Sequence, residues 1–461
     1  MENFKVDVAL EESKEKLFEY LNKKQYFKGR DELLKYHAVD IAELLEEIIE
    51  EIGIQKAVIM FRLLPKDISV DVFSSLPIVD QIDIINVITD VEIEYILDEM
   101  DFDDMIDVLE ELPANIVDKI LEKTPKNERT LINTFLNYKA DSAGSLMTPD
   151  YISLTKEMTV REALKYIREV GMDSETMYTC YVKDSGRKLQ GIVSLRTLVV
   201  TSKDSMISEI MNEDYVWVNV DDDQEQVSDE FRKYGFLAIP VVDKEHRLVG
   251  IITVDDILDV MEEEATEDME RMGGVIDQED KDYLDMSVWH HVKARLPWLL
   301  LLMCSYLITG TIITRFEDVL SSVICLVSYM PMLMGTGGNS GSQSSTLIIR
   351  GMATNEVDTK DALKVLWKEF RISFVVGMVV SGINFARIIW LDNNSIMIAL
   401  TVSSSMLVIV IIAKLIGGML PMLAKKVGID PALMAGPMIA SITDMVALGT
   451  YFFMAAVFLG L

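Results

Sequence analysis

The segment Tyr329-Met-Pro331-Met-Leu-Met-Gly335-Thr-Gly-Gly-Asn339-Ser-Gly-Ser-Gln343-Ser-Ser lies inside an apolar stretch that is long enough to cross a membrane. Its four glycines, proline, asparagine and glutamine would expose backbone and amide groups to lipid. Such exposure is tolerated only where a segment is buried in protein or lines water. A close helix-packing surface of small residues is one interpretation. We favour the other, a broken or distorted helix whose carbonyl and amide groups line a hydrated path.

The last part of the chain holds this segment among five candidate membrane spans, each long enough to cross. They are residues 296–314, 319–349, 370–391, 396–423 and 431–460. Most basic residues of the connections fall on one side, so the positive-inside rule places the N-terminal body in the cytosol and the C-terminus outside. The charged N-terminus lacks the apolar core of a cleaved signal peptide. We therefore expect a multi-pass protein of the cell membrane, surrounded by lipid.

The rest of the chain has a very different composition. Of 461 residues, 43 are Lys or Arg and 75 are Asp or Glu, which gives a net charge of −32. Residues 1–295 hold 33 of the basic and 66 of the acidic residues, and so account for the whole imbalance. This acidic body excludes nucleic acid as a partner, because phosphate attracts the opposite charge. The scattered Cys180, Cys304 and Cys325 predict neither a disulfide framework nor a thiolate zinc site.

Asp444 lies near the middle of the last apolar run. A carboxylate at that depth is costly unless it faces water, a cation or a partner, so it is a candidate functional residue. Lys414 is the plausible intramembrane partner, but it lies near the cytosolic end of its span and can snorkel. Asp430, just before Pro431, is either a helix N-cap or the inner mouth of the same path.

Oxygen donors around one buried carboxylate, without His, Cys or Glu, suit a hard cation. Mg²⁺ is the natural candidate. It gives up its water reluctantly, so a pore for it needs a ring of hydrogen-bond acceptors around a hydrated ion. Repeated across a symmetry axis, one aspartate per chain would supply two carboxylates.

Residues 140–261 contain an internal repeat. Leu146-Met-Thr-Pro-Asp-Tyr151 matches Ile210-Met-Asn-Glu-Asp-Tyr215, and Lys188-Leu-Gln-Gly-Ile-Val-Ser-Leu195 matches Arg247-Leu-Val-Gly-Ile-Ile-Thr-Val254. Both copies then start a helix, and the pair resembles tandem CBS domains, which are α/β regulatory modules. Some such pairs bind adenine nucleotides, so ATP is a candidate ligand. Thr253, Asp255 and Asp256 lie where that pocket often contacts a ribose, although a helix cap is an equal interpretation.

Residues 1–139 show apolar positions at helical spacing, interrupted by Leu-Pro pairs at 64–65, 76–77 and 112–113. This pattern predicts an all-α superhelical domain of stacked hairpins. Acidic residues bunch at 98–111 and again at 255–268, where a long helix leads toward the membrane. A charge run is usually a solvated face. Two such runs joined to an ion-lined membrane part favour acidic surfaces bridged by cations.

Across essentially the whole chain these residues resemble the MgtE family of magnesium channels or transporters. The resemblance is most specific at Pro331 with residues 335–350, at Asp430-Pro431 and at Asp444. It implies, in order, an N domain (1–139), a tandem CBS pair (140–261), a connecting plug helix (262–295) and a transmembrane domain of five helices (296–461). It further implies a homodimer with the pore between the subunits.

The resemblance also implies roles for single residues. Asp444 would bind a hydrated Mg²⁺ ion in the pore, and Asp430 would stand at the pore entrance. The implied ligands of regulatory Mg²⁺ are Asp103, Asp107, Asp256, Asp259, Glu264 and Glu267. Gly235 departs from the pattern, since an aspartate is expected there in some members.

The implied function is Mg²⁺ uptake gated by cytosolic Mg²⁺. Without the ion the acidic N-domain and CBS surfaces repel each other and draw the plug helix aside, whereas bridging ions close the surfaces and block the pore. The alternative is a cation exchanger coupled to sodium or protons, because the sequence does not show whether both gates open together. An enzyme is not expected, since His37, His246, His290 and His291 lie in no catalytic setting.

Overall fold

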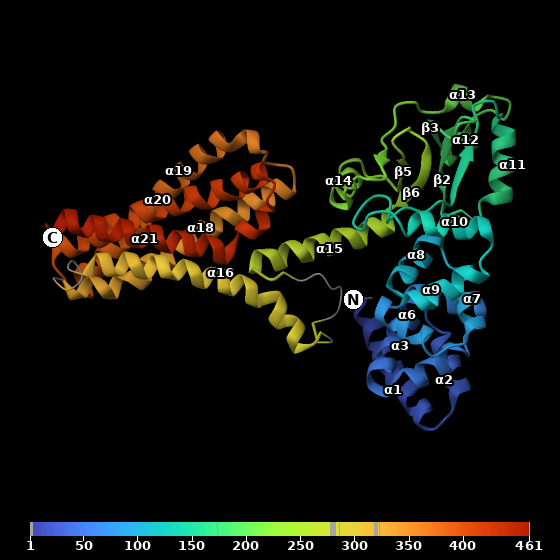
Figure 1. The fold of residues 1–461 in the computed structure, drawn as a ribbon, viewed down its shortest axis with the longest axis horizontal. Helices are drawn as coiled ribbons and strands as arrows, with labels where there is room; N and C mark the ends of the chain where they lie inside the picture. Colours follow the sequence, from blue (N-terminus) through green and yellow to red (C-terminus); the bar gives the residue numbers. More distant parts are fainter. Residues whose placement is uncertain are drawn as a thin grey trace. The chain divides into compact units, whose positions relative to one another are not determined.

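The structure is a computed structural model that describes residues 3–172, 174–276, 283–284, 286–317, 321 and 323–460. It divides into two compact units, residues 1–262 and residues 263–461. Helix α15 (Val254–Gly273) begins in the first unit and ends in the second. Figure 1 labels the helices and strands along the chain.

Within the described residues, the first unit opens with ten helices. They are α1 (Asn3–Asn22), α2 (Tyr26–Leu33), α3 (Ala38–Ile52), α4 (Ile54–Phe61), α5 (Lys66–Ser74), α6 (Ile78–Ile85), α7 (Asp90–Glu99), α8 (Phe102–Glu111), α9 (Ala114–Lys123) and α10 (Lys126–Phe135). Helices two apart in sequence pack together, α2 on α4, α4 on α6 and α6 on α8 in one row, and α3 on α5 and α5 on α7 in the other. The predicted all-α superhelix is confirmed.

Proline sets where several of these helices begin. Pro65, Pro77, Pro113 and Pro125 each stand directly before the first residue of a helix. The fixed φ of proline suits a helix start, and its missing N–H is no loss there because the first N–H groups have no partner within the helix.

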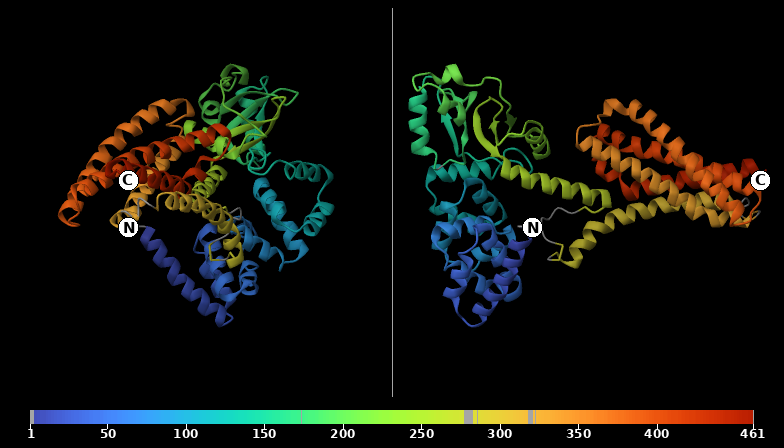
Figure 2. Two further views of the ribbon diagram at one scale, coloured as in Figure 1. Left: turned by 60° about the vertical axis from the view of Figure 1, so that its left-hand side comes forward. Right: turned by 180° about the vertical axis from the view of Figure 1, so that it is seen from behind.

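Two similar halves follow, as the internal repeat predicts. The first comprises β1 (Tyr151–Leu154), α11 (Val160–Val170), β2 (Thr176–Lys183), β3 (Leu189–Ser194) and α12 (Leu195–Val200), and the second α13 (Ile207–Ile210), β4 (Val218–Asn219), α14 (Gln224–Tyr234), β5 (Ala238–Val242) and β6 (Leu248–Thr253). Each half forms a three-stranded sheet with one parallel and one antiparallel pairing. Figure 2 shows the two sheets side by side.

The repeated glycines allow the two halves to interlock. A Cβ on Gly250 would lie 2.8 Å from the carbonyl oxygen of Thr148, and one on Gly191 would lie 2.9 Å from that of Asn212. The opening segment of each half therefore lies against the sheet of the other. The Thr148 amide also donates a 2.8 Å hydrogen bond to the Ile251 carbonyl.

Two residues noted in the sequence serve helix ends. Gly235 follows α14 with a φ of +67°, which glycine adopts without strain. At the start of α15, the Asp256 carboxylate accepts a 2.8 Å hydrogen bond from the Thr253 hydroxyl and another from the Thr253 backbone, as the third helical residue does in a capping box.

The second unit contains the apolar helices. They are α16 (Val288–Arg315), α18 (Met330–Ala353), α19 (Ala362–Trp390), α20 (Ile396–Val427) and α21 (Gly436–Leu459), with the short 3₁₀ segments η1 (Ile324–Tyr329), η2 (Thr359–Asp361) and η3 (Pro431–Met434). Among the described residues, four helical stretches are long and apolar enough to span a membrane: 288–315, 359–390, 396–427 and 431–459. The fifth expected span corresponds to α18, a 24-residue helix rich in small polar residues that packs against α20 and α21.

The prediction that this segment forms a broken helix is wrong. The helix runs unbroken from Met330 to Ala353, with Pro331 in its first turn. A Cβ on Gly417 of α20 would lie 2.1 Å from the carbonyl oxygen of Gly341, so the two helix backbones are in contact. The glycines therefore provide the close helix-packing surface that was the other interpretation.

Candidate metal centre

Asp444 lies midway along α21, in a stretch that is apolar enough to cross a membrane. Its side chain is half-buried, and no hydrogen bond or ion pair joins it to another residue that the structure describes. The neighbouring Thr443 donates a 2.8 Å hydrogen bond to the Ile439 carbonyl of its own helix instead. The carboxylate is thus available to a ligand.

Lys414 does not neutralise Asp444. Its side chain is only 5% exposed, and Nζ donates a 3.3 Å hydrogen bond to Oε1 of Gln343 on α18. The expectation that Lys414 snorkels to the cytosolic surface is therefore wrong. This hydrogen bond holds the side-chain amide of Gln343 in place.

The sequence interpretation missed Glu369. It lies on α19, is buried, and accepts a 2.6 Å hydrogen bond from the Ser344 hydroxyl on α18. The signal was a carboxylate directly before the expected span 370–391, which the span boundary excluded. The apolar stretch in the structure begins at Thr359, so Glu369 falls inside it.

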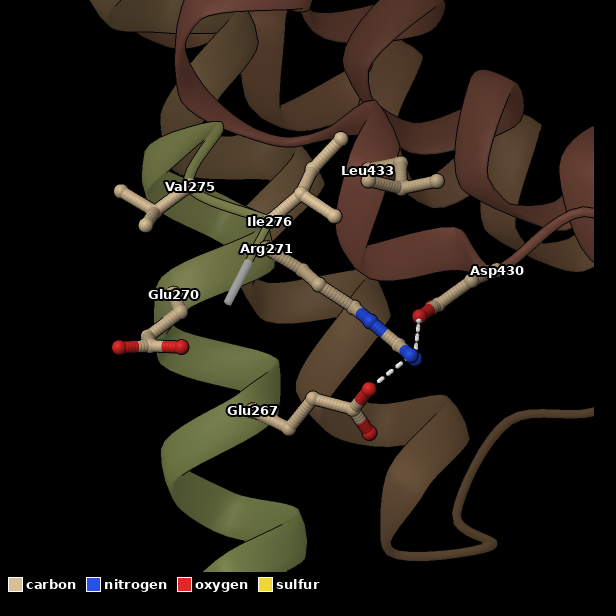
Figure 3. Close-up of a pocket in the computed structure, with 7 residues that line it drawn as sticks. All are labelled: Glu267, Glu270, Arg271, Val275, Ile276, Asp430 and Leu433. Atoms are coloured by element: carbon tan, nitrogen blue, oxygen red, sulfur yellow. Dashed lines mark hydrogen bonds and ion pairs between the residues drawn. The ribbon is translucent and has the colours of Figure 1, made fainter. Parts of the chain in front are cut away.

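Asp430 has the first of the two roles considered for it, that of a helix cap. One carboxylate oxygen caps η3 by accepting a 2.8 Å hydrogen bond from the Ala432 amide. The other accepts a 2.5 Å hydrogen bond from Arg271 Nη1 at the end of α15. Arg271 also pairs with Glu267, one turn earlier on α15. Figure 3 shows Arg271 reaching across the pocket between these two carboxylates.

Further carboxylates surround this pocket. Its lining is Glu267, Glu270, Arg271, Val275, Ile276, Asp430 and Leu433. Burial and the nearby Asp430 carboxylate raise the pKa of Asp268. Burial also raises the pKa of Glu267, against the opposite influence of Arg271. Acidic groups whose charged forms are disfavoured in this way are stabilised by added positive charge.

A second acidic cluster lies inside the first unit, between α8 and the CBS pair. Burial and the carboxylates of Asp256 and Glu175 raise the pKa of Asp103 to about 9. Burial and the neighbouring acids raise the pKa of Glu175 to about 7. The pKa of Asp256 rises to about 6, chiefly through burial. Glu175 was not expected, because a lone acid before a strand gives no sequence signal.

The remaining predicted ligands are more dispersed. Asp107 on α8 and Asp259 on α15 are exposed, and Glu264 is half-buried on α15. Asp256 and Asp259 belong to the first unit, whereas Glu264 and Glu267 belong to the second. Nowhere in the described ranges do three His, Cys, Asp or Glu side chains lie close enough to hold a metal ion.

Comparison with known proteins covers both units. Residues 330–454 match the MgtE family model, described as a divalent cation transporter. Residues 36–141 match the MgtE intracellular N domain, and residues 143–203 and 207–263 match the CBS domain. The magnesium transporter MgtE of Thermus thermophilus is 37% identical over 437 residues, which is 93% of this chain and 95% of that protein. The chain belongs to the MgtE family.

Two further proteins are similar to this chain, one over nearly its whole length and one over about half of it. The magnesium transporter MgtE of Bacillus subtilis is 33% identical over 431 residues, 93% of each chain. A crystal structure of the soluble part of a magnesium transporter is 31% identical and covers 56% of this chain and 99% of that one, with a TM-score of 0.50. MgtE is a family of divalent cation transporters, and the apolar helices of this chain make it a multi-pass membrane protein.

The MgtE matches enclose most candidate residues. The N-domain match contains Asp103 and Asp107, the second CBS match contains Asp256 and Asp259, and the transporter match contains Asp430 and Asp444. Glu264 and Glu267 lie between the CBS and transporter matches.

Proposed function

We propose that this chain transports Mg²⁺ across the cell membrane and that Asp444 binds the ion in transit. The observation that carries this proposal is the unpartnered, half-buried carboxylate in the middle of α21. Mg²⁺ takes oxygen ligands and keeps several of its waters, which suits one accessible carboxylate better than a closed cage. The two curated relatives named above are both magnesium transporters.

We propose that the chain works as a homodimer. Asp444 is half-buried and Gln343 is exposed on the single subunit, although both lie in the apolar unit. Polar groups facing lipid are costly, so a second subunit is the natural cover for them. Two Asp444 carboxylates would then flank one hydrated ion. Five crossings would leave the N-terminus in the cytosol and the C-terminus outside.

Regulation by cytosolic Mg²⁺ is the second part of the proposal. In the first unit, Asp103 and Asp256 come from different domains, and the Asp256 carboxylate helps to raise the pKa of Asp103. A divalent cation between them would replace protons and hold α8 against the start of α15. The proposed regulatory ligands remain Asp103, Asp107, Asp256, Asp259, Glu264 and Glu267. ATP binding by the CBS pair stays a prediction.

A coupled exchanger is the second candidate, and Glu369 is the observation in its favour. A carboxylate buried in an apolar helix and bonded to one hydroxyl is a possible carrier of a proton. Mg²⁺ flux that depends strictly on a sodium or proton gradient would support exchange. Discrete single-channel openings in a lipid bilayer would support a channel.

Growth of a strain that lacks its own magnesium uptake tests the proposal. We expect wild type to support growth at limiting Mg²⁺ and Asp444→Ala to abolish it, with unchanged amounts of protein in the membrane. Glu356→Gln, which removes an exposed carboxylate from the same unit, is the matched control and should grow as wild type. Wild-type growth of Asp444→Ala would overturn the assignment.

A further inference from the structure

Helix α19 has two sides of different character. It packs chiefly against α20, and the residues on that side are buried: Val365, Glu369, Ser373 and Gly377. The other side exposes apolar side chains at helical spacing: Leu363, Trp367, Phe370 and Phe374. Figures 1 and 2 show α19 at the margin of the apolar helices, beside α20. The exposed side is therefore a surface for lipid.

The basic residues of α19 differ in their partners. They are Lys364, Lys368, Arg371 and Arg387. The first and the last pair with aspartates just outside the helix, Asp361 at 2.7 Å and Asp392 at 3.1 Å. Lys368 and Arg371 are exposed, and within the described part of the chain neither forms an ion pair or a side-chain hydrogen bond. Two cations one turn apart thus lack a counter-ion.

A tryptophan lies beside these two cations. The Arg371 guanidinium lies over the Trp367 ring, 5.8 Å from its centre, and the ring stacks on Phe370 with 5.7 Å between centres. Trp367 is 58% exposed. Tryptophan prefers the boundary between lipid headgroups and acyl chains. A guanidinium stacked on a ring keeps its N–H groups available for phosphate. The two cations are therefore placed at the depth of the headgroups.

The surroundings select the class of anion. At this depth, phospholipids present phosphate groups, and basic residues there attract anionic lipids. A choline headgroup carries its own positive charge beside the phosphate, whereas a glycerol headgroup leaves the phosphate charge unneutralised. The apolar side of α19 continues from Trp367 to Phe374, so it offers a surface to the acyl chains of the same molecule.

We propose that Lys368, Arg371 and Trp367 form a binding site for an anionic phospholipid, with its phosphate on the two cations and its acyl chains along the exposed side of α19. The inference goes beyond Mg²⁺ transport, because it requires only that this unit spans a membrane.

The position of the site gives the lipid a structural role. Glu369 follows Lys368 directly in sequence but lies on the buried side of α19, where it accepts a 2.6 Å hydrogen bond from Ser344 of α18. The bound headgroup and this hydrogen bond therefore hold opposite sides of the same turn. The lipid fixes the depth at which α19 meets α18.

Native mass spectrometry of the full-length protein in detergent, without divalent cations, measures lipid binding. Phosphatidylglycerol is the probe, and phosphatidylcholine is the uncharged reference. We expect wild type to bind phosphatidylglycerol more tightly. The double variant Lys368→Gln/Arg371→Gln should bind it roughly 25-fold more weakly, about fivefold for each cation. Its affinity for phosphatidylcholine should be unchanged.

The matched control removes the same charge from the same end of α19. Lys360→Gln/Lys364→Gln takes away two exposed lysines that have aspartate partners, Asp358 and Asp361. It should bind phosphatidylglycerol as wild type does. Arg371→Lys keeps the charge but loses the planar group over Trp367, so its affinity should be intermediate.

Four results would overturn the inference. Wild-type affinity in Lys368→Gln/Arg371→Gln would show that these cations do not bind the headgroup. An equal loss in the control would indicate a general positive field and no site. Equal wild-type affinity for the two lipids would leave only an apolar surface. Displacement of phosphatidylglycerol by an equal concentration of soluble glycerol 3-phosphate would indicate a site for a soluble phosphate.

Single variants keep the test valid if the double variant fails to fold. Lys368→Gln and Arg371→Gln should each weaken phosphatidylglycerol binding about fivefold. Wild-type affinity in both would likewise overturn the inference.

Discussion

The Ser344 hydroxyl on α18 donates a 2.6 Å hydrogen bond to the Glu369 carboxylate on α19, and both side chains are buried. In an apolar setting, a carboxylate with a single donor is destabilised if that donor is lost. This bond therefore ties the glycine-rich helix to its neighbour.

We predict that Ser344→Ala lowers the free energy of unfolding by about 1–3 kcal/mol, because Glu369 loses its donor without gaining another. Thermal unfolding in detergent, followed by size-exclusion chromatography, measures the change. Ser404→Ala is the control, since among the residues that the structure describes the Ser404 hydroxyl bonds to the carbonyl of Thr401 on its own helix and to no side chain. Equal melting temperatures for Ser344→Ala and wild type would show that Glu369 finds another partner.

A methyl group on Gly417 should also destabilise the protein. Its Cβ would meet the Gly341 backbone at 2.1 Å, so α18 and α20 would have to move apart. We expect Gly417→Ala to cost about 1–3 kcal/mol, as is typical of overpacking. Gly335→Ala is the matched control, because a Cβ there meets nothing within 4 Å. Equal thermal stability of the two variants would contradict the close contact.

These contacts show which parts of the structure the sequence could predict. The CBS pair was predictable because Gly191 and Gly250 recur in equivalent strands, and local repetition is visible in one chain. The continuity of α18 was not. Glycine and proline predict a break because they lower the local preference for helix. That loss is offset by the packing of Gly341 against Gly417, which lies on another helix.

The candidate site likewise contains residues that the sequence could predict and contacts that it could not. Asp444 could be found from its depth in an apolar run, because burial of a charge there is costly whatever the fold. The pairing of Arg271 with Asp430 joins residues 159 positions apart, and no spacing rule connects them. Glu175 joins the Asp103 cluster only through folding of the CBS pair against the N domain.

The pH dependence of the first unit should follow Asp103. Its pKa is about 9 in the folded chain against an ordinary value of 3.8, so the folded state binds the extra proton. The stabilisation is fully present below pH 3.8 and is lost as the pH rises through about 9. Without divalent cations, the wild-type unfolding midpoint should fall across this range, and Asp103→Asn should flatten the slope.

Thermal unfolding in EDTA at several pH values measures this slope. Asp118→Asn, which removes an exposed carboxylate from α9, should keep the wild-type slope. If the unfolding midpoint of Asp103→Asn fell equally steeply with pH, a group other than Asp103 would bind the proton.

Joint neutralisation of Asp256, Asp259, Glu264 and Glu267 tests whether acidic surfaces sense Mg²⁺. Limited proteolysis of wild type should show increasing protection between the N domain and the CBS pair as Mg²⁺ rises, and the quadruple variant should show a nearly constant pattern. High monovalent salt should reproduce only part of the protection, because screening weakens repulsion but supplies no bridging ligand. Unchanged Mg²⁺-dependent protection in the variant would mean that these carboxylates are only a solvated face.

The central claim is that Mg²⁺ crosses the membrane at Asp444, and flux into proteoliposomes tests it most directly. Purified wild type, Asp444→Asn and Glu356→Gln are reconstituted at equal density with a Mg²⁺ indicator inside. The account predicts rapid Mg²⁺ entry for wild type and Glu356→Gln, and entry at the rate of protein-free liposomes for Asp444→Asn. Wild-type entry through Asp444→Asn would contradict it.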